Sequence, residues 1–435
     1  MKACIIAAPM TGSGKTTVTL GLLSALRSRG LSVQPFKVGP DFIDTSLHEI
    51  AAGVPSNNLD GWMLSRDANE QLFDLAAAGK DVAIVEGVMG LFDGFDGRSN
   101  TGSTAEIAQW LDLPILLVVD AAPLARSAAA IIRGLLNFDP QLRFAGVIFN
   151  RVAGEGHYRI LVDAVKELPL LGWLPPEPDI HIQERHLGLL TSEELEAKKA
   201  VDRIGEFFRR HIDVDRILEA LPEREVQSVN SPGFSTASKR IRVAVARDPA
   251  FSFYYHSNLR AMEWAGAEIT EFSLLREARV PDADFLYIGG GYPEIYRAQL
   301  QANQSMRHSV RQHIASGKRF YAECGGLMYL AQHIEDCEMV GILPTRIEMT
   351  ERPVDFGYCE VTTRQSSVLG PSGTRIRGHQ FHYSRCAPPS SNPLYSVKQG
   401  SREYGEGFCL ENGVASYVHL HFLSNPAVVQ NMLQS

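Results

Sequence analysis

The stretch APMTGSGKTT, residues 8–17, constrains this chain more than any other part of its sequence. It follows the apolar run 3–8 and precedes an amphipathic stretch at 17–29, which is the strand-to-helix setting of a phosphate-binding loop. In such a loop the backbone N–H groups hold phosphate oxygens, the lysine reaches the β- and γ-phosphates, and the next hydroxyl binds Mg²⁺. We therefore predict an ATP site with a magnesium ligand at Thr16, formed by Gly12, Ser13, Gly14, Lys15, Thr16 and Thr17.

The opening position of this loop is unusual. The common pattern G-x-x-x-x-G-K-[ST] starts with glycine, but Pro9 stands at that position here. This departure is similar to the loops of dethiobiotin synthetase and the partition ATPases, which couple ATP to carboxylates or to switching. A ligand-free Gly/Ser-rich turn is the alternative interpretation, and Gly-Lys-Thr-Thr between a strand and a helix argues against it.

The rest of the N-terminal half alternates apolar runs with helical periods. The runs at 82–87, 114–120 and 144–150 are continuous, as in strands that a parallel sheet buries on both faces. Amphipathic stretches lie between them, and Gly30 is placed to end the first predicted helix. This pattern predicts a doubly wound α/β domain with a parallel sheet.

A second domain is indicated by a change of composition. One charged helix is predicted over 192–220, and the Ser- and Pro-rich segment 222–239 is typical of a linker. Strand signals then restart at 241–246 and continue at 284–291 and 318–324. We predict a synthetase domain at 1–221, a linker at 222–239 and a second α/β domain at 240–435.

Composition excludes several classes of protein. The net charge of -8 argues against nucleic-acid binding, for which a basic domain is usual. The six cysteines form no C-x-x-C pair, so we expect neither a disulfide framework nor a zinc site. No apolar run is long enough for a membrane span and no signal-peptide pattern is present, so we expect a cytoplasmic protein. We keep a homodimer as one possible assembly.

Acidic residues follow two of the predicted strands. Asp41 and Asp44 come after the strand end in FKVGPDFID, and Glu86 and Asp93 lie in VEGVMGLFDG. These carboxylates would surround the γ-phosphate, where a cation must relieve their repulsion. Mg²⁺ ligands are therefore predicted at Thr16, Asp41 and Glu86, although each aspartate could instead cap a helix or be solvated.

Asn150 ends the predicted strand 144–150. Its side chain could bind the adenine, and capping the following helix is equally consistent with the sequence.

A candidate nucleophile lies in the second domain. Cys324 comes directly after an apolar strand and before a Gly-Gly pair that opens a helix, which is the arrangement of a nucleophile elbow. Backbone N–H groups of Gly290 or Gly291 are the predicted oxyanion donors. A buried structural cysteine is the alternative, and the Glu-Cys-Gly-Gly context argues against it.

Two segments could supply the base for this cysteine. RGHQFHYS contains His379 and His382, while ASYVHLHFLSNP offers His419 and His421. We favour His419 because it lies at the end of the strand predicted at 413–418. His382 is then a decoy or a substrate contact.

The phosphate loop, the Glu-Cys-Gly-Gly elbow, GGGYPE at 289–294 and SYVHLHF at 416–422 together resemble the cobyrinic acid a,c-diamide synthase family. The resemblance covers nearly the whole chain. It implies a dethiobiotin-synthetase-like ATPase domain fused to a class I type glutamine amidotransferase domain. The implied reaction is ATP-dependent, glutamine-hydrolysing amidation of the a and c acetate carboxylates of cobyrinate through acyl phosphates, in cobalamin biosynthesis.

The same resemblance implies roles for individual residues. Cys324 would be the glutaminase nucleophile and His419 its base, with Mg²⁺, ATP, L-glutamine and a tetrapyrrole polycarboxylate bound. Four residues match the acidic synthetase positions: Asp41, Asp44, Glu86 and Asp93. One departure concerns the third group of the glutaminase site, because the residue two after His419 is His421 where class I amidotransferases carry glutamate.

Alternatives to this reading remain open at the sequence level. The same chemistry could act on hydrogenobyrinate or nickel sirohydrochlorin, or the chain could be a cobyric acid synthase. A nucleotide-driven switch with a degenerate amidase domain is a further alternative, against which the pairing of Cys324 with His419 stands. Arg185 and His186 are candidates for binding the polyanionic macrocycle, and a solvated loop is the equal alternative.

Overall fold

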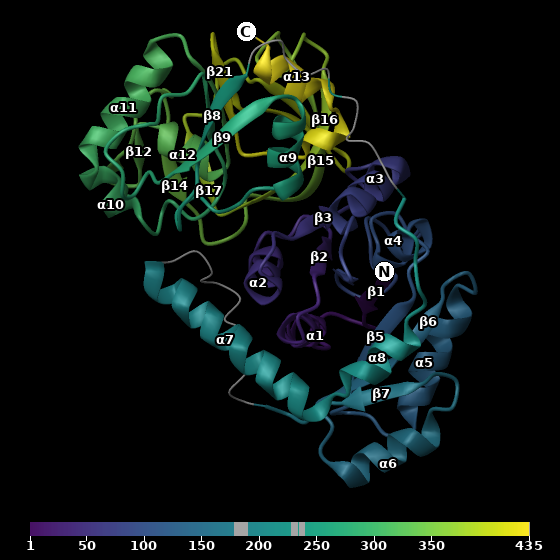
Figure 1. The fold of residues 1–435 in the computed structure, drawn as a ribbon. Coiled ribbons are helices and arrows are strands. Elements are labelled where there is room, and N and C mark those ends of the chain that lie inside the picture. Colours follow the sequence, from purple (N-terminus) through teal and green to yellow (C-terminus); the bar gives the residue numbers. More distant parts are fainter. Residues whose placement is uncertain (178–189, 228–233, 235–239, 435) are drawn as a thin grey trace. The chain divides into compact units, whose positions relative to one another are not determined.

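The computed structural model describes residues 1–177, 190–227, 234 and 240–434, and for 190–195 it describes the backbone alone. The chain divides into two compact units, Met1–Leu187 with Thr191–Asn230 and Gly188–Leu190 with Ser231–Ser435. We call them the N-terminal and the C-terminal unit, and the colour bar of Figure 1 locates each. The division between residues 230 and 231 falls inside the predicted linker, whose two ends stay predictions.

A parallel seven-stranded sheet forms the centre of the N-terminal unit, in the order β3-β2-β4-β1-β5-β6-β7. The predicted doubly wound α/β fold is confirmed. The strand order changes direction beside β1, and ligands of such sheets bind beyond the carboxyl ends of the strands at this place. The strands are β1 Lys2–Ala7, β2 Val33–Val38, β3 Asn57–Leu59, β4 Val82–Glu86, β5 Ile115–Asp120, β6 Phe144–Asn150 and β7 Leu170–Trp173.

Helices connect these strands and bury their apolar sides against the sheet. Cys4 and Ile6 of β1 belong to one buried cluster with side chains of α1, α2, α7 and α8. Leu72 of α3 and Ile107 of α4 are buried outside this cluster. The helices are α1 Lys15–Ser28, α2 Ile43–Ala52, α3 Arg66–Ala77, α4 Thr104–Trp110, α5 Ser127–Phe138, α6 Glu155–Ala164, α7 Leu190–His211 and α8 Val214–Ala220.

The prediction of one helix over 192–220 is wrong, because the segment forms α7 and α8. Ile212 turns into the core with 4% of its surface exposed, and the Asp213 side chain accepts a hydrogen bond from the Asp215 N–H at 3.0 Å. An aspartate in this position starts a new helix by satisfying one of its free amides. After α8, the N-terminal amine of Met1 donates to the Arg224 carbonyl at 2.9 Å, so the beginning of the predicted linker packs on the N-terminal unit.

The C-terminal unit is built on a six-stranded sheet in the order β20-β21-β11-β10-β8-β9. All neighbouring strands are parallel except β20, which runs antiparallel to β21 at the edge. The sheet strands are β8 Ile241–Ala246, β9 Ala267–Phe272, β10 Phe285–Ile288, β11 Arg319–Glu323, β20 Phe408–Leu410 and β21 Gly413–Ser416. The helical segments are α9 His256–Trp264, α10 Arg297–Ala302, α11 Gln304–Ala315, α12 Gly325–Leu330, η1 Phe422–Ser424 and α13 Ala427–Leu433.

Two smaller sheets complete this unit. One has the order β13-β12-β14-β17 and the other the order β19-β18-β15-β16-β22. Through β22, the second sheet reaches the segment that carries His419, because His379 of β16 lies opposite His419. Their strands are β12 His333–Ile334, β13 Cys337–Glu338, β14 Arg346–Met349, β15 Asp355–Thr363, β16 Arg375–His382, β17 Ser384–Ala387, β18 Tyr395–Gln399, β19 Arg402–Glu406 and β22 His419–Leu420.

None of the helices in the described part of the chain combines the length and the apolar character that a bilayer crossing needs.

Candidate active sites

The predicted phosphate loop connects β1, the central strand of its sheet, with α1. Gly12 and Gly14 have φ angles of 80° and 96°, which few residues other than glycine adopt. The Ser13 hydroxyl donates to the Met10 carbonyl at 2.9 Å and tightens the turn. The loop therefore presents its backbone at the carboxyl end of the sheet, where α1 begins.

Asn150, at the end of β6, holds this loop from a strand two places away from β1 in the sheet. Its side-chain amide donates to the Ser13 carbonyl at 3.0 Å, and a Cβ on Gly14 would lie 2.1 Å from Asn150 Nδ2. Helix α6 begins after Gly154, so Asn150 is not its capping residue. The adenine contact of Asn150 stays a prediction.

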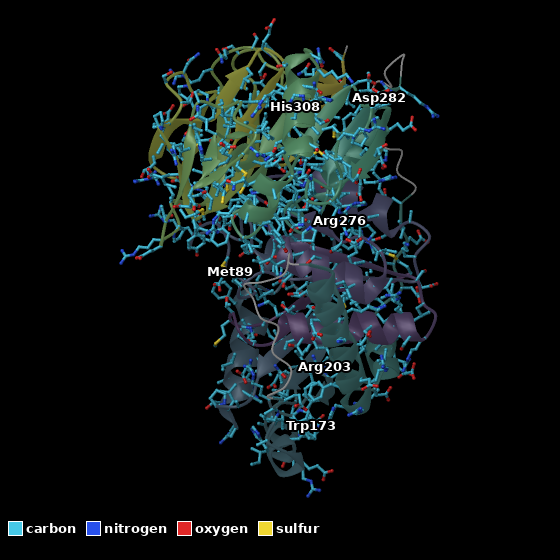
Figure 2. All side chains as sticks on the ribbon, turned by 90° about the vertical axis from the view of Figure 1, so that its left-hand side faces the viewer. Met89, Trp173, Arg203, Arg276, Asp282 and His308 are labelled. Carbon is cyan, nitrogen blue, oxygen red and sulfur yellow. The ribbon has the colours of Figure 1, made fainter. Side chains whose placement is uncertain are left out.

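Lys15 and Thr16 start α1 and direct their side chains to the end of β4. Lys15 is 8% exposed, and its ammonium donates to the Met89 carbonyl at 2.5 Å. Met89 itself is 41% exposed and has a φ of 46°; Figure 2 labels it. The Thr16 hydroxyl donates to Glu86 Oε1 at 2.7 Å, so the loop and the acidic strand end form one site.

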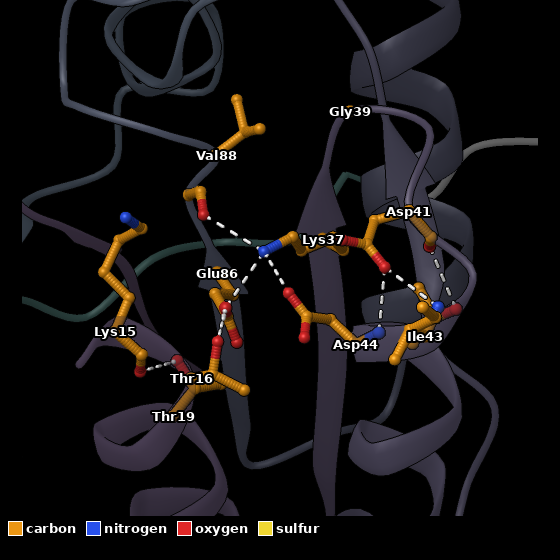
Figure 3. Close-up of polar contacts among 12 residues, drawn as sticks. Lys15, Thr16, Thr19, Lys37, Gly39, Asp41, Ile43, Asp44, Glu86 and Val88 are labelled. Atoms are coloured by element: carbon orange, nitrogen blue, oxygen red, sulfur yellow. Dashed lines mark hydrogen bonds and ion pairs between the residues drawn. The ribbon is translucent and has the colours of Figure 1, made fainter. Parts of the chain in front are cut away.

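Lys37 lies at the centre of the acidic cluster, as Figure 3 shows. Its ammonium is 2.6 Å from Asp44 Oδ2 and 2.9 Å from Glu86 Oε1, and its side chain is 5% exposed. The sequence indicated that a cation must relieve the repulsion between the carboxylates. For Asp44 and Glu86, the chain supplies that cation itself.

His48 is the second residue of this network that sequence reasoning missed. Its Nε2 lies 2.8 Å from Glu86 Oε2 and its Nδ1 lies 3.2 Å from the Ser56 hydroxyl, with both partners buried. Glu86 is thus held by three side chains, since Thr16 and Lys37 contact its other oxygen. No motif marked His48, but helical spacing from Asp44 on the same face of α2 is a signal that could have found it.

Asp41 and Asp93 lie on the loops around this network and each binds backbone amides. Asp41 Oδ1 accepts from the amides of Ile43 and Asp44, both at 2.9 Å, at the start of α2. Asp93 Oδ2 accepts from the Gly90 amide at 2.9 Å. Both aspartates therefore shape the loops in which they lie.

Burial and charge set the protonation states of the cluster. Burial favours a neutral amine at Lys37, but Glu86 and Asp44 outweigh it and raise the pKa of that ammonium. Burial opposes the charge of Glu86, and the Lys37 ammonium reverses the effect and lowers the pKa of that carboxyl. Burial and the positive charge of Lys37 lower the pKa of Lys15. Burial and the Glu86 carboxylate raise the pKa of Asp44 to about 7. At neutral pH the Lys37–Glu86 pair is therefore charged, whereas Asp44 is at its titration point.

The oxygen donors at Thr16 and Glu86 fit the chemistry of Mg²⁺. The described residues contain no group of three or more His, Cys, Asp or Glu side chains that could hold a metal by themselves. Mg²⁺ at nucleotide sites usually has only one or two protein ligands, with phosphates and water as the others. The Thr16 hydroxyl and Glu86 Oε1, 2.7 Å apart, suit this role.

In the C-terminal unit, Cys324 lies between β11 and α12 on a strained turn. Its φ is 50° and its ψ is -104°, and it is 5% exposed. The Cys324 N–H donates to the Ser416 carbonyl at 2.7 Å, which joins the turn to β21. A non-glycine residue in this conformation costs energy, and such strain is typical of a nucleophile elbow.

His419 lies beside Cys324. A Cβ on Gly290 would be 2.3 Å from His419 Cε1 and 3.3 Å from Cys324 Cβ, so the three residues surround one small space. Burial favours the neutral ring, but the neighbouring Cys324 thiolate and the Glu323 carboxylate raise the pKa of His419 to about 10. The arrangement places an imidazolium beside the Cys324 sulfur, a setting that favours a reactive cysteine.

The other histidines have different partners. His379 stacks on His419 with ring centroids 5.0 Å apart and shares a hydrogen bond of 2.7 Å with the Tyr255 hydroxyl. His382 stacks on Tyr417 at 3.9 Å, and its Nδ1 is 2.8 Å from the Ser384 carbonyl. Of the candidate bases, the geometry brings His419 to Cys324.

Gly290 and Gly291 line the same space. The Gly290 amide donates to the Phe253 carbonyl at 3.3 Å, a long bond that would have to open for oxyanion binding. The Gly291 nitrogen is 3.1 Å from where a Cβ on Gly325 would stand, next to the elbow. Their role as oxyanion donors stays a prediction. Arg185 and His186, the candidates for macrocycle binding, lie outside the described residues.

Comparisons with known proteins agree with this division of the chain. Residues 4–189 match the CobQ/CobB/MinD/ParA nucleotide binding domain, and residues 242–427 match the CobB/CobQ-like glutamine amidotransferase domain. The chain is 42% identical over 99% of its length to the cobyrinate a,c-diamide synthase of Listeria monocytogenes serotype 4b, of which the alignment also covers 99%. It is 42% identical to the protein of that name from Synechococcus sp., over 100% of this chain and 98% of the relative. The chain is 40% identical to the Salmonella typhimurium protein of that name, over 99% of this chain and 97% of the relative.

Proposed function

Because the chain belongs to the cobyrinate a,c-diamide synthase family, we propose that it amidates the a and c acetate carboxylates of cobyrinate through acyl-phosphate intermediates. It is a glutamine-dependent amidating ligase of cobalamin biosynthesis, with a nucleotide-binding domain that uses ATP. The convergence of Cys324 and His419 next to Gly290 is the observation that carries the proposal, because a nucleotide-driven switch needs no such pair.

The N-terminal unit activates the carboxylate, which is a poor electrophile while it is ionised. An acetate oxygen attacks the γ-phosphorus of ATP, the bond to the β-phosphate oxygen breaks, and ADP leaves. Ammonia then attacks the acyl carbon, the carbon–oxygen bond to phosphate breaks, and the new amide loses a proton. This chemistry depends mainly on positioning and on charge neutralisation.

Residues of the phosphate loop and the acidic cluster supply this positioning and charge neutralisation. Lys15 and the backbone of the loop hold the γ-phosphate. The Lys37 ammonium fixes the positions of the Glu86 and Asp44 side chains. Asp41 and Asp93 fix the two loops that border the site. Thr16 and Glu86 would hold Mg²⁺, with Asp41 as the third predicted ligand, and the ion would supply positive charge to neutralise the phosphates.

The C-terminal unit supplies ammonia. The Cys324 thiolate attacks the side-chain carbonyl of glutamine, and the amides of Gly290 or Gly291 hold the oxyanion. His419 gives its proton to the departing nitrogen, and the carbon–nitrogen bond breaks. Water, deprotonated by His419, then releases glutamate from the thioester.

The substrate is tested by incubating the full chain with ATP, Mg²⁺, glutamine and one tetrapyrrole at a time. Mass measurement should show two successive amidations of cobyrinate, with none or fewer on hydrogenobyrinate and nickel sirohydrochlorin. A product amidated at other side chains would instead indicate a cobyric acid synthase. Glutamine hydrolysis without any amidated product would contradict the proposal.

Two further parts of the proposal concern the setting of the enzyme. All six cysteines are free thiols, which supports a reducing compartment such as the cytoplasm. Both candidate sites are built from residues of one chain. A homodimer remains a prediction that light scattering can test.

A further inference from the structure

The C-terminal unit lacks the glutamate that usually follows the glutaminase histidine two residues later. His421 stands at that position and is fully buried. Its Nε2 is 3.2 Å from the Ser257 hydroxyl, and burial lowers the pKa of its ring to about 3. A neutral ring of this kind cannot stabilise an imidazolium as a carboxylate does.

Another carboxylate reaches His419 from the elbow itself. Glu323 is the residue directly before Cys324 and is fully buried at the end of β11. Its Oε1 is 3.8 Å from His419 Nδ1. The Cε1–Nε2 edge of the ring borders the space that Gly290 and Cys324 share. The histidine therefore lies between a carboxylate and the thiol.

Two tyrosines fix the Glu323 side chain in this position. The Tyr287 hydroxyl donates to Oε1 at 2.9 Å and the Tyr321 hydroxyl donates to Oε2 at 2.8 Å. Tyr321 and Glu323 face the same side of β11 because strand residues alternate, and Tyr287 of β10 lies directly beside Tyr321. Burial raises the pKa of both hydroxyls well above the ordinary value of 10, so both remain donors.

We propose that Glu323 is the third, positioning residue of the glutaminase site, which orients His419 and stabilises its imidazolium form. The proposal rests on the proposed roles of Cys324 and His419. One strand end then provides both the orienting carboxylate and the nucleophile, and the two side chains reach different edges of the same ring. The function of the missing glutamate is supplied from a different place in the chain.

The charge of His419 is set by a small group of neighbours. The Cys324 thiolate and the Glu323 carboxylate favour the imidazolium. His379, stacked on the ring, and His382 carry pKa values that burial lowers, so they add no positive charge at neutral pH. Of these groups, Glu323 is the one whose carboxylate oxygen lies on the Nδ1 side of the ring, at 3.8 Å.

The test uses Glu323→Gln in the full chain, which removes the charge and keeps the shape. We expect kcat for glutamine hydrolysis to fall about 10²-fold or more, with KM changed little. Amidation with ammonium salt should persist. The rate at which iodoacetamide alkylates Cys324 can be followed by mass spectrometry of the peptide that contains it. The pH midpoint of this rate should be higher in the variant, because the weakened imidazolium no longer favours the thiolate.

Control variants separate positioning from folding. Glu323→Asp retains the charge and should recover part of the lost kcat. Tyr287→Phe removes one hydrogen bond but leaves the carboxylate, so its loss should be smaller than that of Glu323→Gln. The proposal would be overturned if Glu323→Gln hydrolysed glutamine with a kcat within about threefold of the wild-type value and showed an unchanged pH dependence of alkylation.

A loss of amidation with both nitrogen sources, without a shift in alkylation, would also overturn it by showing a structural role. The proposed function has a separate control. If Cys324→Ala hydrolysed glutamine, the glutaminase assignment itself would fail, whatever Glu323→Gln does.

Discussion

The two candidate sites solve opposite electrostatic problems. In the N-terminal unit, buried Glu86 and half-buried Asp44 surround the ammonium of Lys37, so a cation from the chain itself balances their charge. In the C-terminal unit, a single thiol and a single imidazole face each other in a space lined by glycine. The first site must hold many negative charges in place, and the second must create one negative charge on sulfur. The comparison indicates that each unit can be disabled without disabling the other.

The largest effect should come from the phosphate loop. Lys15→Ala should lower amidation by more than about 10³-fold with glutamine and with ammonium salt alike, since both need the activated carboxylate. Alkylation of Cys324 should be unchanged in this variant. Product mass with each nitrogen source measures the effect. Ammonium-dependent synthesis that survives in Lys15→Ala would break the comparison, because activation would then not require this lysine.

Lys37 tests whether the acidic cluster depends on its own cation. Lys37→Met removes the ammonium from buried Glu86 and half-buried Asp44, although Thr16 and His48 still contact Glu86. Breaking a buried ion pair from one side typically costs about 3–5 kcal/mol. Urea unfolding followed by tryptophan fluorescence gives this loss. As a control, Lys199→Met removes an exposed ion pair of 2.8 Å with Glu196 and should cost about 1 kcal/mol or less. Equal losses in the two variants would show that the cluster does not need Lys37.

A smaller effect is expected in the pH dependence of amidation, which should differ between glutamine and ammonium as nitrogen sources. The pKa of His419 is raised from 6.5 to about 10, so its proton is present below about pH 10 and is lost above it. Glutamine-dependent amidation should therefore fall as the pH rises through this value, because His419 must protonate the departing ammonia. Ammonium-dependent amidation should show no such fall. A decline of the glutamine reaction already between about pH 6 and 8 would indicate an ordinary histidine.

The difference between the units also explains what could be predicted from the sequence. A phosphate loop is a local motif, so Lys15 and Thr16 were recognised from residues 8–17 alone, and the parallel sheet followed from its apolar runs. Lys37 was missed although it lies next to the quoted acidic residues, because a lone lysine at the end of a strand is ordinarily solvent-exposed. Its role arises only when β2 and β4 pair and bring it to Glu86.

In the C-terminal unit, the nucleophile elbow is a local sequence motif, but the residues that contact it come from distant parts of the chain. Cys324 could be recognised from its neighbours, whereas the choice between His382 and His419 depended on which strand end lies against it. Glu323 was noted only as part of Glu-Cys-Gly-Gly. The sequence does not show that tyrosines of two paired strands hold its carboxylate in place. The small sheets, formed by strands between residues 333 and 420, left no clear signal because several of these strands have only two to five residues.

The central claim is that Cys324 and His419 serve only to release ammonia, while the N-terminal unit makes the amide. It is tested most directly by measuring amidated product from Cys324→Ala with glutamine and with ammonium salt at alkaline pH, beside His419→Ala and the control His382→Ala. We predict that the first two variants lose the glutamine reaction by about 10³-fold or more and keep the ammonium reaction. His382→Ala should keep glutamine hydrolysis. Loss of the ammonium reaction in Cys324→Ala, or a glutamine defect in His382→Ala beside an active His419→Ala, would contradict the account.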